Sequence, residues 1–280
     1  MTTALRSAAG RSAARPRKPR PSPFGLGVGV VAIALTVVTA FDWRFGTGLT
    51  FRGFIDNFGG RNSVIAAIPR ADLDQMFSAR DRGAFLDTVG IAVISSVAGT
   101  LVALPLALWS TRLGAPYRWV EVTARGIGSV IRSFPDVLWA LIFVAAVGVG
   151  ALPGVLALFF FSIAVITKLT ADTVDGIDTG PLEAADASGS GHTQKLRTAV
   201  VPQILPAYAS FALYAFELNL RASVVVGIVG GGGIGSRLEF FRNNYPGADR
   251  WEKVWGLVVM FVIVVFIIDR VSIALRRRLV

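Results

Sequence analysis

Long apolar runs constrain this chain more than any other feature of its sequence. A helix needs about 20 mainly apolar residues to cross the hydrocarbon core of a bilayer, and six runs are long enough. These runs lie near residues 24–42, 84–109, 126–150, 153–171, 203–229 and 252–271. A content of 53% hydrophobic and 16% charged residues, with a mean hydropathy of +0.61, exceeds what one water-soluble core of 280 residues would bury. The sequence therefore predicts an all-α, polytopic membrane protein with about six transmembrane helices.

The basic residues predict how these helices are oriented. The formal net charge is +10, and arginine and lysine are concentrated at the two ends of the chain. Because cytoplasmic flanks of membrane proteins carry an excess of basic residues, both termini are expected in the cytoplasm. An even number of crossings agrees with this orientation. Residues 43–83 would then lie on the external side of the membrane and residues 110–125 on the cytoplasmic side.

This predicted topology divides the chain into four parts. Residues 1–23 contain six basic residues and no acid, and are expected to be a disordered cytoplasmic tail. The composition of the tail also fits a transit peptide, but its prolines disfavour an amphipathic targeting helix. The first transmembrane helix and the external segment make up residues 24–83, the main transmembrane domain residues 84–271, and a basic cytoplasmic C-terminus residues 272–280.

The residue types exclude several kinds of chemistry. The chain has no cysteine and a single histidine, His192, so a disulfide framework, a thiol nucleophile and a thiolate metal site are excluded. No G-x-x-x-x-G-K-[ST] motif occurs, and the G-x-G-x-x-G match at 230–235 follows a membrane span without a βαβ unit. Nucleotide binding by this chain is therefore not expected.

One polar segment, EAADASGSGHTQKLRTAVVP, interrupts the apolar runs. It extends from Glu183 to Pro202 and lies on the predicted cytoplasmic side. Gly189 and Gly191 divide it, which predicts two short helices that meet at an angle. Helices this short are marginal without a packing partner, so a partner surface is expected. The alternative is a solvated loop.

The spacing within this segment resembles the membrane subunits of binding-protein-dependent ABC importers. Their cytoplasmic signature is approximately E-A-A, three residues, G, nine residues, I-x-L-P. The residues that match it here are Glu183, Ala184, Ala185, Gly189 and Pro202. Val201 replaces the leucine conservatively, and Ala199 stands where isoleucine is usual. The resemblance implies that residues 181–200 form a coupling helix that docks into a groove of a cytoplasmic ATPase.

Two further stretches resemble the phosphonate-type members of that family. They are RSFPDVLWALIFVAAVGVG, which starts at Arg132, and FELNLRASVVVGIVGGGGIG, which starts at Phe216; the similarity covers roughly residues 86–238. The resemblance implies transport of phosphonate or a related oxyanion such as phosphate or phosphite. It also implies a homodimer, ATPase subunits that bind ATP and magnesium, and an extracytoplasmic substrate-binding protein. A permease for another small solute, such as methionine, shares the scaffold and stays an alternative.

Charged residues within the apolar runs are candidates for the substrate path. A charge at bilayer depth is costly and normally faces a pore, a partner or the bundle interior. Arg221 is the best candidate because its planar fork suits two phosphoryl oxygens, although Glu217, four residues away on the same helix, could instead pair with it. Asn219 and Arg132 are assigned to the same path; Arg132 lies nearer the cytoplasmic end, where its side chain could instead reach the interface. A flexible gate is assigned to the glycines Gly230, Gly232, Gly233 and Gly235.

These inferences together predict a permease subunit of an ABC importer in the bacterial cytoplasmic membrane, with no cofactor of its own. The chain is not expected to be an enzyme, since an intramembrane enzyme would need a Ser–His pair or two aspartates within the spans, and neither pair is evident. A passive channel or scaffold would leave the coupling signature unexplained.

Overall fold

The computed structural model describes residues 23–41, 64–74 and 78–279, and every regular element in these ranges is helical. The predicted tail therefore lies outside the described residues, apart from Pro23. The elements are α1 (Pro23–Phe41), η1 (Ile68–Arg70), α3 (Ala79–Trp109), α4 (Arg118–Ser133), α5 (Asp136–Val147), α6 (Ala151–Val174), α7 (Gly180–Ala187), α8 (His192–Lys195), η3 (Leu196–Val200), α9 (Val201–Val226), η4 (Gly227–Gly231), α10 (Gly233–Asn244) and α11 (Gly247–Leu279). The predicted all-α class is confirmed.

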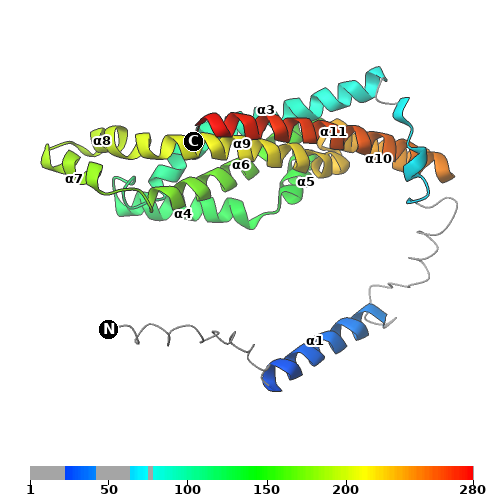
Figure 1. Cartoon of the computed structure of the whole chain (residues 1–280), viewed down its shortest axis with the longest axis horizontal. Helices are drawn as coiled ribbons and strands as arrows, with labels where there is room; N and C mark the ends of the chain where they lie inside the picture. The colour runs from blue at the N-terminus through cyan, green and yellow to red at the C-terminus, as the bar shows by residue number, and fades with distance from the viewer. Residues whose placement is uncertain (1–22, 42–63, 75–77, 280) are drawn as a thin grey trace, which may run out of the picture. The chain divides into compact units, whose positions relative to one another are not determined.

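Two compact units are present. The first, residues 1–58, contains α1, an apolar helix with exposed side chains along residues 27–38. The second, residues 59–280, contains all the other elements. In this second unit α3, α6, α9 and α11 run along the length of the bundle, as Figure 1 shows in cyan, green, yellow and red.

Four helical stretches of the described chain are long and apolar enough to cross a membrane. They are Ala79–Trp109, Ala151–Val174, His192–Gly231 and Asp249–Arg277. A fifth crossing is formed if α4 and α5 are counted as one broken span, and α1 is a shorter apolar helix. The number of apolar helices therefore agrees with the prediction of about six.

The continuous span predicted at 126–150 is wrong. α4 begins earlier, at Arg118, and α4 and α5 meet at an angle of 86°. The break falls at Phe134, which is extended at φ −96° and ψ 125°, and at Pro135. Proline disfavours the helical conformation of the residue before it and cannot donate a backbone hydrogen bond, so the helix ends here. α5 then starts with amides of Leu138 and Trp139 that donate to the Pro135 carbonyl.

Small side chains bring the central helices together. Ala92, Ala103, Ala157 and Ala215 are fully buried between α3, α6 and α9. At Gly99 of α3 a β-carbon would meet the Ser162 β-carbon at 2.4 Å, so only glycine permits this approach. Small residues at interfaces let backbones of membrane helices approach closely, where dispersion contacts and hydrogen bonds replace the hydrophobic effect. Large apolar side chains such as Leu86 and Leu101 point outward instead.

The segment before α3 packs on the start of α11. The Asp72 amide donates to the Glu252 carbonyl at 3.0 Å, Lys253 pairs with Asp72 at 3.1 Å, and the Trp255 indole donates to the Val64 carbonyl at 2.7 Å. The described part of the predicted external segment is therefore attached to the bundle. α11 continues as one helix through residues 272–279, which include the three arginines Arg276, Arg277 and Arg278.

Candidate functional site

α7 is a short polar helix anchored on the end of the bundle by one side chain. Leu182 is buried in a cluster with Val174, Val200 and Ile204, which joins α7 to α6 and α9. Glu183 and Ala184 are exposed, whereas Ala185 is half-buried against the same cluster. α7 is thus held on the bundle and carries the exposed carboxylate of Glu183.

The predicted break after this helix is confirmed. Gly189 has a φ of +71°, and the amides of Gly189 and Ser190 donate to the carbonyls of Asp186 and Ala185. This pattern is the Schellman C-cap, in which a left-handed residue after the helix satisfies its last carbonyls. Glycine takes this conformation at little cost, which explains why this position breaks the segment.

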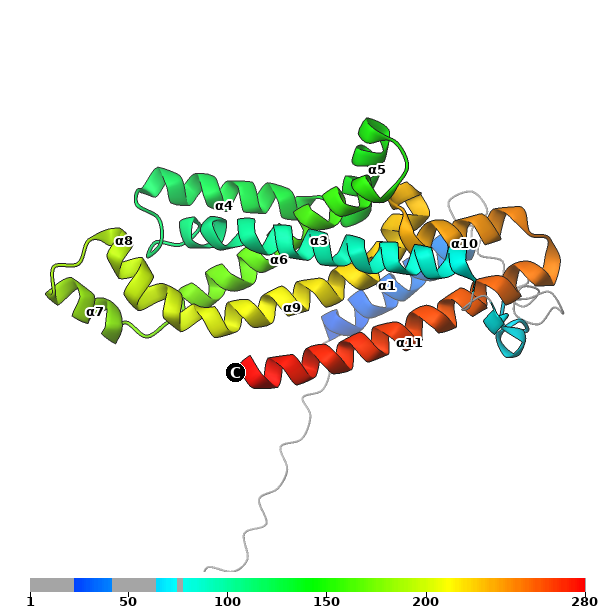
Figure 2. The ribbon, with the colours of Figure 1, turned by 90° about the horizontal axis from the view of Figure 1, so that it is seen from above.

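α8 returns toward the bundle and is tied to its neighbours. Lys195 forms an ion pair with Asp186 of α7, and the His192 Nε2 lies 3.2 Å from the Gly114 carbonyl oxygen in the turn between α3 and α4. Figure 2 shows α7 and α8 at one end of the bundle and α10 at the opposite end. His192 therefore has a structural contact here.

The second half of the polar segment is not the separate short helix that was expected. α8, the π-helical turn η3 and α9 form one helical run. Pro202 lies in the first turn of α9, directly after η3. Proline has no backbone N–H to donate, so the regular hydrogen-bond pattern is interrupted at Pro202. The wider π-helical turn η3 accommodates this interruption. α8 is therefore continuous with α9, which carries the predicted path residues Glu217, Asn219 and Arg221.

The alternative considered for Arg221, a pair with Glu217 on the same helix, is wrong. The Arg221 guanidinium donates to Asp269 Oδ2 at 2.6 Å, and Glu217 forms an ion pair with Arg276. Asp269 and Arg276 both belong to α11, which runs antiparallel to α9. Residues four apart on one helix face the same neighbour, and here that neighbour supplies partners of opposite charge. The two ion pairs clamp α9 to α11.

Asn219 lies on the other side of α9, inside the bundle. It is 0% exposed, and its Nδ2 lies 2.7 Å from the Ser96 hydroxyl and 2.6 Å from the Ser162 hydroxyl, with Ser95 at 3.2 Å. These hydroxyls come from α3 and α6. The side chain therefore joins three membrane helices, and the structure does not bring it together with Arg221.

A polar cavity lies between α4 and α6. α4 turns apolar side chains such as Trp119 and Val130 outward, while its other flank carries arginine and serine. This cavity, of about 320 Å³, is lined by Ser110, Arg125, Gly128, Ser129, Arg132, Thr167, Lys168, Ala171, Asp172 and Asp175. A second cavity of about 490 Å³ shares Arg132 and Lys168 and extends along Phe134, Asp136, Tyr214 and Leu218. Two cations therefore lie at the junction of two cavities beside the break between α4 and α5.

The interactions of these two cations differ. Arg132 donates to the Ser129 hydroxyl at 3.1 Å and has no carboxylate partner in the described part of the chain. Lys168 lies 2.5 Å from Asp172, one turn further along α6. Lys168 was not among the predicted path residues; the signal for it was a lysine at bilayer depth in an apolar run, like Arg132.

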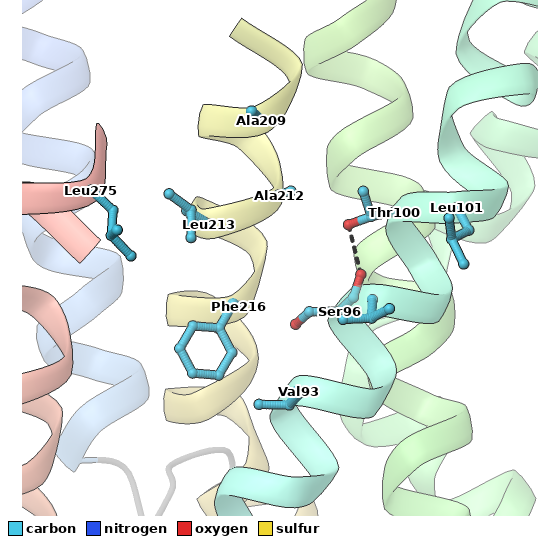
Figure 3. A pocket seen from close by; sticks show the side chains of 10 residues that line it. Val93, Ser96, Thr100, Leu101, Ala209, Ala212, Leu213, Phe216 and Leu275 are labelled. Carbon is cyan, nitrogen blue, oxygen red and sulfur yellow. Dashed lines mark hydrogen bonds between the residues drawn. The ribbon is translucent and has the colours of Figure 1, made fainter. Parts of the chain in front are cut away.

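A larger cavity is almost wholly apolar. It measures about 560 Å³, lies between α3, α9 and α11, and is lined by residues such as Val93, Leu213, Phe216 and Leu275 (Figure 3). The hydroxyl of Thr100 at its wall donates to the Ser96 carbonyl at 2.6 Å. Because an oxyanion needs cationic or amide partners when water is removed, this cavity does not suit one.

The glycine run forms a bend at the end of α9. Gly230, Gly232 and Gly233 have φ values of +104°, +80° and +67°, which side chains rarely tolerate. At Gly235 a β-carbon would meet the Val224 carbonyl oxygen at 2.1 Å. The Gly230 carbonyl accepts from the Gly150 amide at 2.9 Å. After this bend the chain continues as α10, whose first amides include that of Ile234, bonded to the Thr88 hydroxyl at 2.7 Å.

No cluster of His, Cys, Asp or Glu within the described ranges could hold a metal ion. The elements that the structure does place together are an anchored polar helix at one end, a cationic junction beside a broken span, and a glycine bend beyond it. These features define a helical membrane protein with charged cavities inside its bundle.

Comparison with solved structures identifies the fold. The chain is similar to a subunit of the inward-facing MetNI methionine ABC transporter, with a TM-score of 0.60 and 22% identity over 71% of this chain and 95% of that one. It is also similar to an amino acid ABC transporter crystallised with histidines, with a TM-score of 0.61 and 18% identity over 74% of this chain and 99% of that one. The fold is that of a type I ABC importer permease.

The chain belongs to the family described as the binding-protein-dependent transport system inner membrane component, whose model matches residues 99–280. It is therefore a multi-pass membrane protein and a transport component, not an enzyme. The phosphate-import permease protein PhnE of Mycolicibacterium smegmatis is 36% identical over 194 residues, or 69% of this chain and 35% of that protein. This chain thus spans about a third of the length of that relative.

A second relative is closer to this chain in length. The phosphite transport system permease protein PtxC of Stutzerimonas stutzeri is 36% identical over 192 residues, or 69% of this chain and 68% of that protein. The predicted resemblance to phosphonate-type permeases of binding-protein-dependent importers is confirmed.

Proposed function

We propose that this chain is the permease subunit of an ABC importer that moves phosphonate, phosphate or phosphite across the cytoplasmic membrane by alternating access. The observation that carries the proposal is the cationic junction of Arg132 and Lys168, where two cavities meet beside the break between α4 and α5. The names of the two relatives above support an oxyanion as the substrate.

The junction suits a phosphoryl group that must bind and leave again. An oxyanion loses water as it enters a protein cavity and then needs charged hydrogen-bond donors, which a guanidinium and an ammonium supply. The carboxylates of Asp136 and Asp172 line the same cavities and offset much of the positive charge. Weak net attraction is appropriate, because a translocated ion must be able to leave each site.

We assign energy coupling to α7. Its outer surface carries Glu183 and Ala184, while Leu182 and the C-cap at Gly189 hold it on the bundle. A cytoplasmic ATPase that binds ATP and magnesium would dock here, and movement of α7 and α8 would pass through Pro202 into α9. Two copies of this chain would enclose the path, and a binding protein would deliver substrate at the end that carries α10.

The remaining predicted site residues have roles in this cycle. The bend at Gly230, Gly232, Gly233 and Gly235 is the proposed gate, since its backbone can take conformations closed to other residues. Arg221 and Glu217 hold α9 against α11, and Asn219 holds α9 against α3 and α6, so these three residues keep the path walls in register during reorientation.

Uptake by the complete transporter in proteoliposomes tests this assignment. Arg132→Gln/Lys168→Gln should lower oxyanion uptake at least tenfold, because two charged contacts of the transported anion are lost. Arg270→Gln/Arg277→Gln removes the same charge from exposed positions of α11 that line neither cavity and should transport normally. The parent complex should not take up methionine. Normal uptake by the first variant, or uptake of methionine in place of the oxyanion, would contradict the proposal.

A further inference from the structure

Two cavities adjoin the turn between α3 and α4, and neither is lined by Arg132 or Lys168. One, of about 510 Å³, is polar and is lined by Arg112, Ala115, Pro116, Tyr117, Arg118, Glu121, Val122 and Arg125. The other, of about 490 Å³, is apolar and is lined by Leu106, Trp109, Pro116, Tyr117, Trp119, Val120, Thr123, Ala124 and Ile127. Pro116 and Tyr117 line both, so the two cavities are separated only by this short stretch of chain.

The polar cavity holds an excess of positive charge. Its charged residues are three arginines and one glutamate, which leaves a net charge of about +2 at neutral pH. Arg125 is already engaged: it pairs with Glu121 at 3.0 Å and donates to the Ser110 carbonyl at 3.0 Å. Arg112 and Arg118 are exposed and have no hydrogen-bond or ion-pair partner in the described part of the chain. Two guanidinium groups therefore remain available to an anion.

The apolar cavity has aromatic walls. The side chains of Tyr117 and Trp119 are 65% and 69% exposed and stack with ring centroids 6.4 Å apart. Trp109, the last residue of α3, is 48% exposed. Tryptophan and tyrosine at the ends of membrane helices lie at the level of the lipid headgroups, because their rings have an apolar body and a polar edge.

The position along the bundle agrees with this depth. Gly114 in the same turn accepts the His192 contact from α8, so the cavities lie at the end that carries α7 and α8. Figure 2 shows α4 starting beside that end. A charged cavity and an aromatic cavity therefore lie side by side at the end of the bundle that carries α7 and α8.

We infer that these two cavities form a binding site for one anionic phospholipid. Its phosphodiester lies between Arg112 and Arg118 in the polar cavity, and an acyl chain lies along Trp109 and Trp119 in the apolar one. A free phosphate would satisfy the arginines but leave the adjoining aromatic cavity without an occupant, whereas a phospholipid accounts for both. Basic pockets at the cytoplasmic ends of membrane helices recognise anionic headgroups through this chemistry.

Tryptophan quenching in nanodiscs tests the site with the complete transporter. The discs contain zwitterionic phosphatidylcholine and a titrated fraction of phosphatidylglycerol brominated on its acyl chains. The quenching that is lost in the variant Trp109→Phe/Trp119→Phe is the part that comes from tryptophans of this site. We expect brominated phosphatidylglycerol to quench at a lower mole fraction than brominated phosphatidylcholine does.

Removing the two free arginines should abolish that preference. Each arginine near an anionic headgroup contributes roughly a fivefold preference, so Arg112→Gln/Arg118→Gln should shift the titration midpoint about thirtyfold. The control Arg197→Gln/Arg277→Gln takes the same charge from exposed positions of η3 and α11 and should leave the midpoint unchanged. Equal quenching by the two lipids, or an unchanged midpoint in the first variant, would overturn the inference.

Two further measurements separate the other occupants. Inorganic phosphate added to discs with brominated phosphatidylglycerol should leave the quenching unchanged, and displacement of the lipid would show a free-oxyanion site instead. Loss of quenching in the complete transporter, with retention in the isolated chain, would show that a protein partner covers the site. Oxyanion uptake by the Arg112→Gln/Arg118→Gln variant is measured in parallel, because the lipid site does not depend on the transported substrate.

Discussion

Single polar side chains at bilayer depth hold this bundle together, and their partners come from distant parts of the chain. Glu217 is 8% exposed and pairs with Arg276, 59 residues away; Arg221 pairs with Asp269, 48 residues away. The first pair is the more deeply buried of the two. Removing one partner of a buried pair leaves an uncompensated charge, whereas an exposed pair is screened by water.

Arg276→Gln should therefore lower the free energy of unfolding by about 2–3 kcal/mol, because Glu217 would stay buried without its cation. Glu217→Gln/Arg276→Gln should recover at least half of this loss. Arg221→Gln breaks the more exposed pair and should cost less than about 1 kcal/mol. The thermal midpoint of the detergent-solubilised chain, followed by tryptophan fluorescence, measures all three. If the double variant were as unstable as Arg276→Gln, the unpaired charge of Glu217 would not be the cause of the lost stability.

Asn219→Ala should destabilise the bundle without altering its charge. The amide group joins hydroxyls of α3 and α6, but those hydroxyls also donate within their own helices, for example Ser96 to the Ala92 carbonyl at 2.6 Å. The expected cost is therefore moderate, about 1–2 kcal/mol. Asn243→Ala on the exposed surface of α10 serves as the control and should change stability by less than about 0.5 kcal/mol. The thermal midpoint is again the measurement. Equal midpoints for Asn219→Ala and Asn243→Ala would refute a bridging role for Asn219.

At the scale of elements, α7 and the break between α4 and α5 show what sequence can and cannot predict. The C-cap at Gly189 was predictable because it depends on one residue's backbone freedom. The break at Pro135 also had a local signal, a proline within an apolar run, but apolar length outweighed it in the prediction of one continuous span at 126–150. The partners of Glu217 and Arg221 had no local signal, because residue spacing within α9 says nothing of which charges α11 presents.

Gly189→Ala should weaken coupling, whereas Gly191→Ala should not. A β-carbon meets nothing within 4 Å at either position, so steric space does not distinguish them. Gly189 has a φ of +71° and Gly191 a φ of −68°, so only the first substitution strains the backbone, by about 1 kcal/mol. The ratio of substrate uptake to ATP hydrolysis in proteoliposomes is the measurement. Equal ratios for the two variants would show that the geometry of this C-cap does not matter.

At the scale of the whole molecule, the orientation of the bundle follows from the distribution of basic residues and stays a prediction. The native chain has no cysteine, so single cysteines report on topology without a background. Ala187→Cys lies on the exposed surface of α7 and Asn244→Cys at the end of α10. A membrane-impermeant maleimide should label Ala187→Cys only in inside-out vesicles and Asn244→Cys only in right-side-out vesicles. The reverse pattern would place α7 outside the cell and contradict the positive-inside assignment.

Glu183→Arg tests the proposed coupling of α7 to a separate ATPase. Glu183 is exposed, so its substitution should change the stability of the bundle by no more than about 0.5 kcal/mol. Reversal of its charge at a docked interface should cost the ATPase about a hundredfold in affinity, because like charges would meet there. We expect the variant to keep the parent thermal midpoint, to lose co-purification of the ATPase and to lose substrate-stimulated ATP hydrolysis in proteoliposomes. Retention of the ATPase with hydrolysis at the parent level would contradict the coupling role of α7.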